Sequence, residues 1–130
     1  MAIADSHGLP VAIGITSASP NESTLVDQTL DQRHIAELPK RIIGDKGYDS
    51  DPLDGRMRER GIEMIAPNRA KRGKTQDRRP LRRYVRRWKV ERLFAWLKNF
   101  RRIGSRWERH ALNFLGMVQL GCVLILLRHL

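Results

Sequence analysis

Four side chains suited to binding or cleaving a phosphate occur in the stretch 84–98: Tyr84, Arg87, Glu91 and Lys98. Neither Gly nor Pro interrupts this stretch, so it predicts a helix. At about 100° per residue, the four side chains share one narrow stripe along that helix. The residues expected on its buried side are apolar: Val85, Leu93, Trp96 and Leu97.

Glu91 is the single carboxylate of this stretch, which is otherwise rich in cations. One interpretation gives it an ordinary i,i+4 pair with Arg87, worth about 0.3–0.5 kcal/mol. The other gives it a catalytic task, because hard metal cations take oxygen ligands such as carboxylates. The stripe alone leaves both interpretations open.

A second candidate carboxylate is Asp45, in the block Gly-Asp-Lys-Gly-Tyr-Asp-Ser at 44–50. It follows a short apolar segment at 41–44 that predicts a buried strand. An Asp at the carboxyl end of such a strand lies at the rim of a sheet, where ligands bind in α/β folds. The alternative is an Asp that only shapes a turn.

The charge of the chain is divided unequally between its two halves. The 130 residues carry a formal charge of +11. Residues 1–66 hold 7 Lys and Arg against 11 Asp and Glu, a net of −4, whereas residues 67–109 hold 17 against 3, a net of +14. Such a basic surface on a folded body indicates a nucleic-acid partner.

The two blocks together resemble a known family. The pattern Tyr-x2-Arg-x3-Glu-x6-Lys at 84–98 is similar to the signature of DDE insertion-sequence transposases, in the branch around the insertion-sequence-four and insertion-sequence-five types. The block "DKGYDS" at 45–50 resembles the surroundings of the second catalytic Asp in these families, and "RMRERGIEMIAP" at 56–67 is similar as well.

This resemblance implies two-metal phosphoryl transfer on DNA. Two Mg²⁺ (or Mn²⁺) ions about 3.5–4 Å apart activate the attacking oxygen and stabilise the leaving one. Asp45 and Glu91 would be the catalytic residues and the metal ligands. Arg87 and Lys98 would hold phosphates of the transposon end or of the target DNA, and Tyr84 would contact the DNA backbone or a terminal base.

The family has three catalytic acids, and the strand that carries the first one is absent from this sequence. Asp5 is the available substitute, but its Asp-Ser-His-Gly setting predicts a turn. We therefore expect the chain alone to bind DNA without cleaving it, and to need an N-terminal transposase segment or a homodimer. The alternative function is a non-catalytic, basic DNA-binding remnant or regulator.

The order of expected elements is that of an α/β fold in one partial domain, 1–130. Strands are expected at 1–4, 11–16, 41–44 and 62–66, and helices at 21–32, 51–61, 81–100 and 107–127, with a basic loop at 67–80. The layout predicts a mixed sheet with flanking helices. It resembles the ribonuclease-H-like fold without its first strand.

Three further features bear on location and core. A single Cys122 excludes a disulfide framework within the chain and suits the reducing bacterial cytoplasm, where a DNA-binding protein would associate with the nucleoid. The apolar run Ala111–Leu127 is slightly short for a membrane span and contains Asn113 and Gln119, so it predicts a buried helix. The tryptophans are expected mainly in the core.

Overall fold

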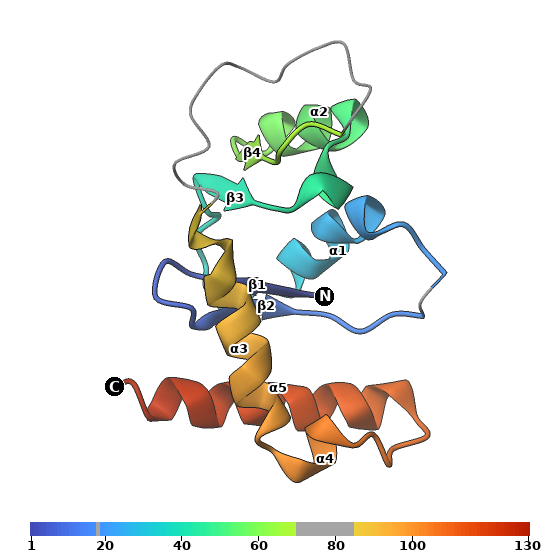
Figure 1. The fold of residues 1–130 in the computed structure, drawn as a ribbon, viewed down its shortest axis with the longest axis vertical. Helices are drawn as coiled ribbons and strands as arrows, with labels where there is room; N and C mark the ends of the chain where they lie inside the picture. Colours follow the sequence, from blue (N-terminus) through green and yellow to red (C-terminus); the bar gives the residue numbers. More distant parts are fainter. Residues whose placement is uncertain (18, 70–84) are drawn as a thin grey trace.

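The computed structural model describes residues 1–17, 19–69 and 85–130, and Figure 1 shows their arrangement. The strands are β1 (Ala2–Ala4), β2 (Pro10–Ile13), β3 (Arg41–Ile43) and β4 (Glu63–Ile65). The helices are α1 (Leu25–Asp31), α2 (Asp51–Glu59), α3 (Trp88–Lys98), α4 (Arg101–Gly104) and α5 (Ala111–Leu127). Two short 3-10 turns, η1 (Glu22–Thr24) and η2 (Lys46–Tyr48), precede α1 and α2. The α/β class is therefore confirmed.

The first two strands form a hairpin around Asp5. The carboxylate of Asp5 accepts hydrogen bonds from the backbone N–H groups of His7 and Leu9, each at 2.8 Å. Gly8 completes the turn at a φ of +82°, a backbone region that glycine adopts without the steric cost of a Cβ. Asp5 is thus a turn residue, as the sequence predicts.

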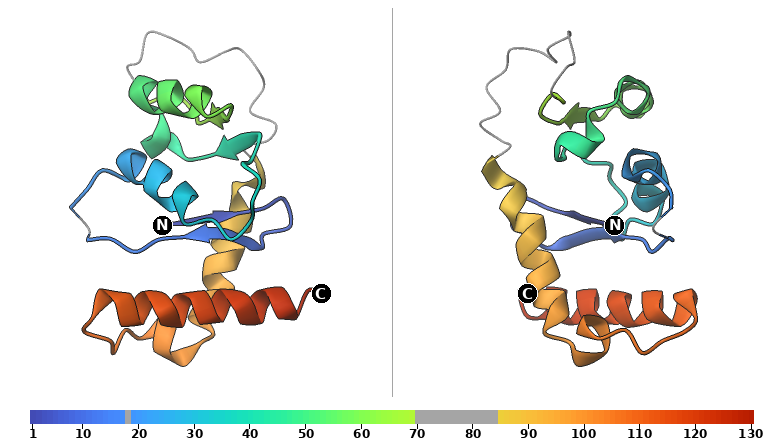
Figure 2. Two further views of the ribbon diagram at one scale, coloured as in Figure 1. Left: turned by 180° about the vertical axis from the view of Figure 1, so that it is seen from behind. Right: turned by 45° about the vertical axis from the view of Figure 1, so that its right-hand side comes forward.

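The described strands form two small sheets, where a mixed sheet without its first strand was expected. β1 and β2 are antiparallel, whereas β3 and β4 are parallel, and no ladder joins the two pairs. In Figures 1 and 2, β1 lies between β2 and the β3–β4 pair. The sheet is interrupted because none of the described strands lies between β1 and β3.

Side chains alternate along each strand, so each sheet has two faces. One face of each sheet contributes to the same apolar core. Ile3, Ile42 and Met64 project from these faces into this core. The helices α1 and α2 cover it with buried residues: Val26, Leu30, Leu53 and Met57.

Ion pairs fasten α1 to α2. Arg56 lies 2.7 Å from the carboxylate of Asp27, and Arg60 bridges Asp27 at 3.3 Å and Asp31 at 2.7 Å. The pKa of Arg60 is raised, chiefly by its hydrogen bond to Asp31. This pairing holds the covering layer together as one unit.

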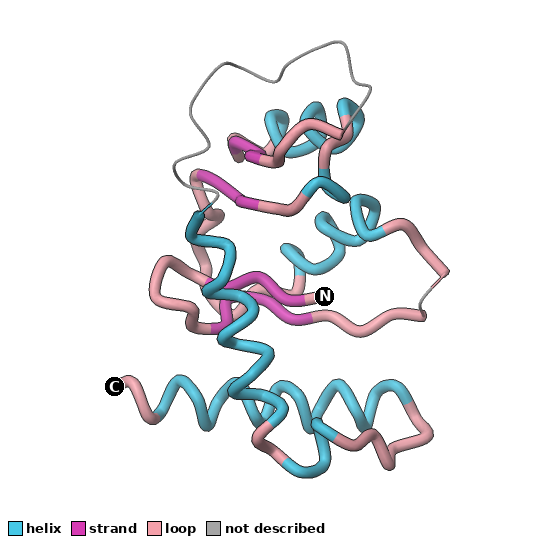
Figure 3. Tube along the Cα trace, in the orientation of Figure 1, coloured by secondary structure: helices cyan, strands magenta, loops and turns pink. Residues whose placement is uncertain are grey.

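The opposite face of the β1–β2 hairpin packs against α3 and α5, which cross in Figure 3. Leu93 and Leu97 of α3 pack against a row of α5 residues and against Ile13 of β2. The α5 members of this core are Val118, Cys122 and Ile125. None of the described helices is long and apolar enough to cross a membrane.

Several details of the α3 region differ from expectation. Residues 81–84 lie outside the described part of the chain, and α3 starts at Trp88. Val85 is 72% exposed where burial was expected, because it precedes α3 and little of the described chain covers its side chain. Trp107, at 78%, and Trp88, at 47%, are also exposed, so the expectation that they are core residues is wrong.

Candidate functional site

Asp45 follows β3 and has an exposed side chain. Its carboxylate oxygen Oδ1 accepts the backbone N–H of Gly47 at 2.7 Å and so caps η2. A Cβ on Gly44 would lie 2.7 Å from the ring of Tyr48 and 2.8 Å from the end of the Met64 side chain. Glycine at this position therefore lets both side chains pack against the chain directly before Asp45.

Glu22 joins this block, although sequence reasoning did not single it out. Its Oε2 lies 4.0 Å from the position that a Cβ on Gly47 would take, so the carboxylate lies close to η2. The pKa of Tyr48 is raised, first by burial and then by the negative charges of Glu22 and Asp45. No sequence signal pairs Glu22 with a residue so far along the chain.

Arg69 is a second residue that the sequence did not identify. Its backbone N–H donates to the carboxylate of Asp49 at 2.8 Å. Its guanidinium donates to the carbonyl groups of Lys46 at 3.0 Å and Gly47 at 2.7 Å. These contacts bind the carbonyl side of η2, so Arg69 stabilises the turn that Asp45 caps.

Glu91 is placed on the outer face of α3. Its side chain is 63% exposed, and the nearest Arg87 nitrogen lies 4.0 Å from its carboxylate. Such a distant, exposed i,i+4 pair contributes little to stability. Lys98 is exposed as well. The expected stripe is therefore confirmed for Arg87, Glu91 and Lys98, whereas Tyr84 lies outside the described residues.

The β1–β2 turn sets the rotation of α3. Lys89 donates to the carbonyl of Ser6, and Arg92 donates to the carbonyl of His7. Because Lys89 and Arg92 face the turn, the side of α3 that bears Glu91 faces solvent. A Cβ on Gly8 would lie 2.8 Å from the Arg92 guanidinium and 3.2 Å from the carbonyl oxygen of Lys89, so a larger residue would crowd this contact.

Asp45 and Glu91 have separate partners in the described structure, and no hydrogen bond or ion pair joins them. Figures 1 and 2 show η2 beside α1, while α3 runs on the other side of the strands. Both carboxylates are exposed and of the type that hard cations take. However, the described residues contain no group of three or more His, Cys, Asp or Glu side chains that could hold a metal ion.

The donor set therefore does not amount to a complete metal site. Each carboxylate can supply a ligand, and the remaining ligands must come from elsewhere. An exposed carboxylate beside basic side chains, on an α/β scaffold, is an arrangement suited to a polyanion such as DNA.

Comparisons with known proteins bear on this arrangement. Residues 1–126 match the family model described as "Transposase DDE domain". The chain is 37% identical over 131 residues to a protein of Burkholderia cepacia named "Putative transposase for insertion sequence element IS402", covering 95% of this chain and 59% of the relative. It is 31% identical over 134 residues to "Putative transposase for insertion sequence element IS6501" of Brucella ovis, covering 98% of this chain and 95% of the relative.

The chain belongs to the transposase DDE domain family. Its resemblance to insertion-sequence transposases is thereby confirmed, and the family acts in DNA transposition through phosphoryl transfer, generally with divalent metal ions. The chain spans 59% of the length of the Burkholderia relative. No solved structure is detectably similar to it.

Proposed function

We propose that this chain is the C-terminal portion of a DDE transposase catalytic domain, which binds transposon-end DNA and contributes Asp45 and Glu91 to a two-metal cleavage and strand-transfer site. The observation that carries the proposal is the solvent-facing position of Glu91 on α3, where its pairing with Arg87 is weak. Metal ions bound at these carboxylates would activate the attacking oxygen and stabilise the leaving one.

Arg87 and Lys98 would bind DNA phosphates on either side of Glu91. Both lie on the exposed side of α3, and further exposed cations continue beyond its end at Arg101 and Arg102. An arginine contacts phosphate through a planar fork of donors, whereas a lysine acts as a point charge. Tyr84 completes the proposed DNA contacts by its position in the sequence pattern.

The arrangement of the strands supports a ribonuclease-H-like fold that lacks one strand. β1 and β3 each pair on one side only among the described strands, and β1 is the hairpin strand on the side of the β3–β4 pair. Ile3 and Ile42 already share one core across this interval. An extended segment seated between β1 and β3 would complete a five-stranded sheet and satisfy both edges.

We infer that this segment belongs to an N-terminal part of the transposase, supplied in the same chain or by a partner molecule such as a second copy. The Burkholderia relative is long enough to contain such a part, since the chain spans 59% of it. The added strand would also change the surroundings of Asp45 and Glu91 and could supply the third acid that the family resemblance implies.

A salt titration of DNA binding tests the proposed interface. Each phosphate contact releases counterions, so log affinity for duplex DNA should fall with log salt at a slope of about −0.9 per phosphate. Replacing Arg87 and Lys98 together by Gln should weaken binding. It should also make the slope shallower by about 1.8, the contribution of two phosphate contacts.

The control is a charge-matched pair on exposed positions away from α3, Lys40 and Arg58. Arg56 is unsuitable as a control because it pairs with Asp27 at 2.7 Å. Binding that does not depend on salt, or that both double variants weaken equally, would count against the α3 interface.

A further inference from the structure

A pocket lies where the end of α3 meets the end of α5, outside the proposed catalytic stripe. Its volume is about 260 Å³. It is lined by Trp96, Asn99, Phe100, Ile125, Arg128 and His129. This volume is slightly below the range of about 300–1,000 Å³ typical of small-molecule sites, so the pocket suits one small planar group.

The aromatic wall of the pocket is held in place by its neighbours. The rings of Trp96 and His129 lie 5.1 Å apart at an angle of 39°. The guanidinium of Arg92 also packs on Trp96, 4.8 Å from the centre of its ring. Because Arg92 is anchored on the His7 carbonyl, these contacts help to hold the indole in place.

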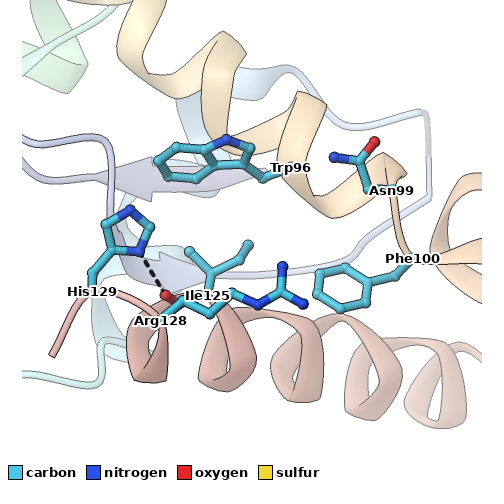
Figure 4. Close-up of a pocket in the computed structure, with 6 residues that line it drawn as sticks. All are labelled: Trp96, Asn99, Phe100, Ile125, Arg128 and His129. Carbon is cyan, nitrogen blue, oxygen red and sulfur yellow. Dashed lines mark hydrogen bonds between the residues drawn. The ribbon is translucent and has the colours of Figure 1, made fainter.

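The tautomer of His129 follows from its hydrogen bond. Its Nδ1 lies 2.8 Å from the carbonyl oxygen of Ile125, which can only accept, so Nδ1 must donate. In the neutral ring, Nε2 is then the acceptor. Figure 4 shows this hydrogen bond on the side of the ring toward α5, with the second ring nitrogen directed away from it.

Two exposed polar side chains complete the lining, Asn99 and Arg128. In Figure 4, the guanidinium of Arg128 lies beside the ring of Phe100, across from Trp96 and Asn99. The lining thus combines aromatic surfaces, an amide that both donates and accepts, and a cation. These are the groups that stack on a nucleobase, bind its polar edge and neutralise a phosphate.

The pocket adjoins the proposed DNA-binding stripe. Asn99 directly follows Lys98, and the cations Arg101 and Arg102 follow Phe100. A DNA strand that runs along Lys98 would therefore pass the mouth of the pocket. Paired bases are stacked inside a duplex, so only an unpaired or extruded base can enter.

We propose that this pocket binds one unpaired nucleobase of DNA, with the adjoining phosphate on Arg128; this rests on the proposed function of the chain. The base lies against the aromatic wall and Asn99 contacts its polar edge. The pocket thereby favours DNA with a single-stranded tail at the end that lies along α3.

The experiment compares three labelled DNAs by fluorescence anisotropy with the whole chain: a blunt duplex, the same duplex with a four-thymidine 3′ tail, and one with an abasic tail of equal length. Stacking of a base on an aromatic group should give the thymidine tail about 5- to 100-fold higher affinity than the abasic tail. Because the two tails carry the same phosphates, this ratio reports the base alone.

Two pocket variants and one matched control locate the effect. Asn99→Leu removes the amide and narrows the pocket. The affinity for the thymidine tail should then exceed that for the abasic tail by no more than about twofold. Arg128→Gln should weaken both tailed DNAs more than the blunt duplex. Arg102→Gln removes the same charge outside the pocket and should weaken all three DNAs alike. Far-ultraviolet circular dichroism confirms folding of each variant.

Each remaining outcome has a defined meaning. Equal affinity for thymidine and abasic tails, with normal duplex binding, overturns the pocket but leaves the proposed function intact. A ratio that Asn99→Leu leaves unchanged, or an Arg128→Gln variant that weakens tailed and blunt DNAs equally, overturns the location. Absence of binding to all three DNAs overturns the proposed function together with the pocket.

Discussion

The backbone N–H of Arg69 donates to the carboxylate of Asp49 at 2.8 Å, across twenty residues of chain. Asp49 is only 3% exposed, so this hydrogen bond is shielded from water. The side chain of the same arginine reaches the carbonyl groups of Lys46 and Gly47. The segment after β4 is thus fastened to the turn that presents Asp45.

Replacing Arg69 by Ala should destabilise this turn. The variant loses two hydrogen bonds from an exposed guanidinium to backbone carbonyls, which should lower the free energy of unfolding by about 1–2 kcal/mol. Urea denaturation measures the change, with Arg58→Ala as the control for loss of an exposed cation. Equal stability of the two variants would show that the guanidinium contacts do not hold η2.

Tyr48 should make the protein sensitive to alkali. Its pKa is raised in the folded protein, so above about pH 10, the ordinary pKa of tyrosine, the unfolded chain loses this proton first. Folding stability is then complete below about pH 10 and falls as the pH rises further, by up to about 1.4 kcal/mol per pH unit.

The Tyr48→Phe variant tests this assignment by thermal or urea unfolding between pH 8 and pH 11. It removes the titrating group, so its stability should fall less steeply above pH 10 than that of the unaltered chain. Glu22→Gln should keep the slope of the unaltered chain up to pH 11, because burial, the largest cause of the raised pKa, remains and keeps Tyr48 protonated in the folded state. A Tyr48→Phe profile identical to that of the unaltered chain would refute the titration of a buried Tyr48.

Two glycines of α5 should respond oppositely to Ala. A Cβ on Gly121 would lie 2.8 Å from Ile103 and 3.1 Å from Leu97, whereas a Cβ on Gly116 would meet nothing within 4 Å. Gly116→Ala should stabilise the helix by up to about 1 kcal/mol. Gly121→Ala gains the same helix propensity but crowds the crossing with α3, at a typical cost of about 1–3 kcal/mol.

The measurement is the difference in unfolding free energy between these two variants, which share the same chemical change on the same helix. Gly121→Ala should be at least about 1 kcal/mol less stable than Gly116→Ala. If Gly121→Ala is as stable as Gly116→Ala, or more stable, then α3 and α5 do not pack as closely at Gly121 as described.

The sequence predicted local structure well where one stretch of chain decides it. The order of strands and helices, the turn at Asp5 and the exposed stripe of α3 are all found in the structure. Each depends on spacing or on turn chemistry within a few residues. Asp45 likewise follows its strand as expected.

Features that depend on distant residues could not be predicted in this way. The pairing of Glu22 with Tyr48 and the hold of Arg69 on η2 join segments more than twenty residues apart. Trp88 was expected in the core by residue type, but its ring is half exposed beside the guanidinium of Arg92, 5.0 Å away. Hydrophobic character alone does not reveal such a cation–π contact.

The division of the strands into two small sheets has a different cause. Strand signals mark which residues are extended, but they do not show which edges pair. The sequence predicted a mixed sheet without its first strand, but it did not show which strand edges would be left unpaired. β1 and β3 do not pair with each other, and the proposed transposase segment would lie between them.

Cleavage of a transposon end by a completed domain tests the central claim most directly. The chain is fused in frame behind the N-terminal part of a longer transposase such as the Burkholderia relative. The fusion is then incubated with a matched transposon end and Mg²⁺. We predict cleavage by the fusion and none by the 130-residue chain alone.

Asp45→Asn and Glu91→Gln should each abolish this cleavage while DNA binding persists, and Glu59→Gln, an exposed acid at the end of α2, should leave it unchanged. Cleavage that survives Asp45→Asn or Glu91→Gln would contradict the assignment of these two carboxylates. Cleavage by the short chain alone, stopped by Asp5→Asn, would show that Asp5 is the third acid.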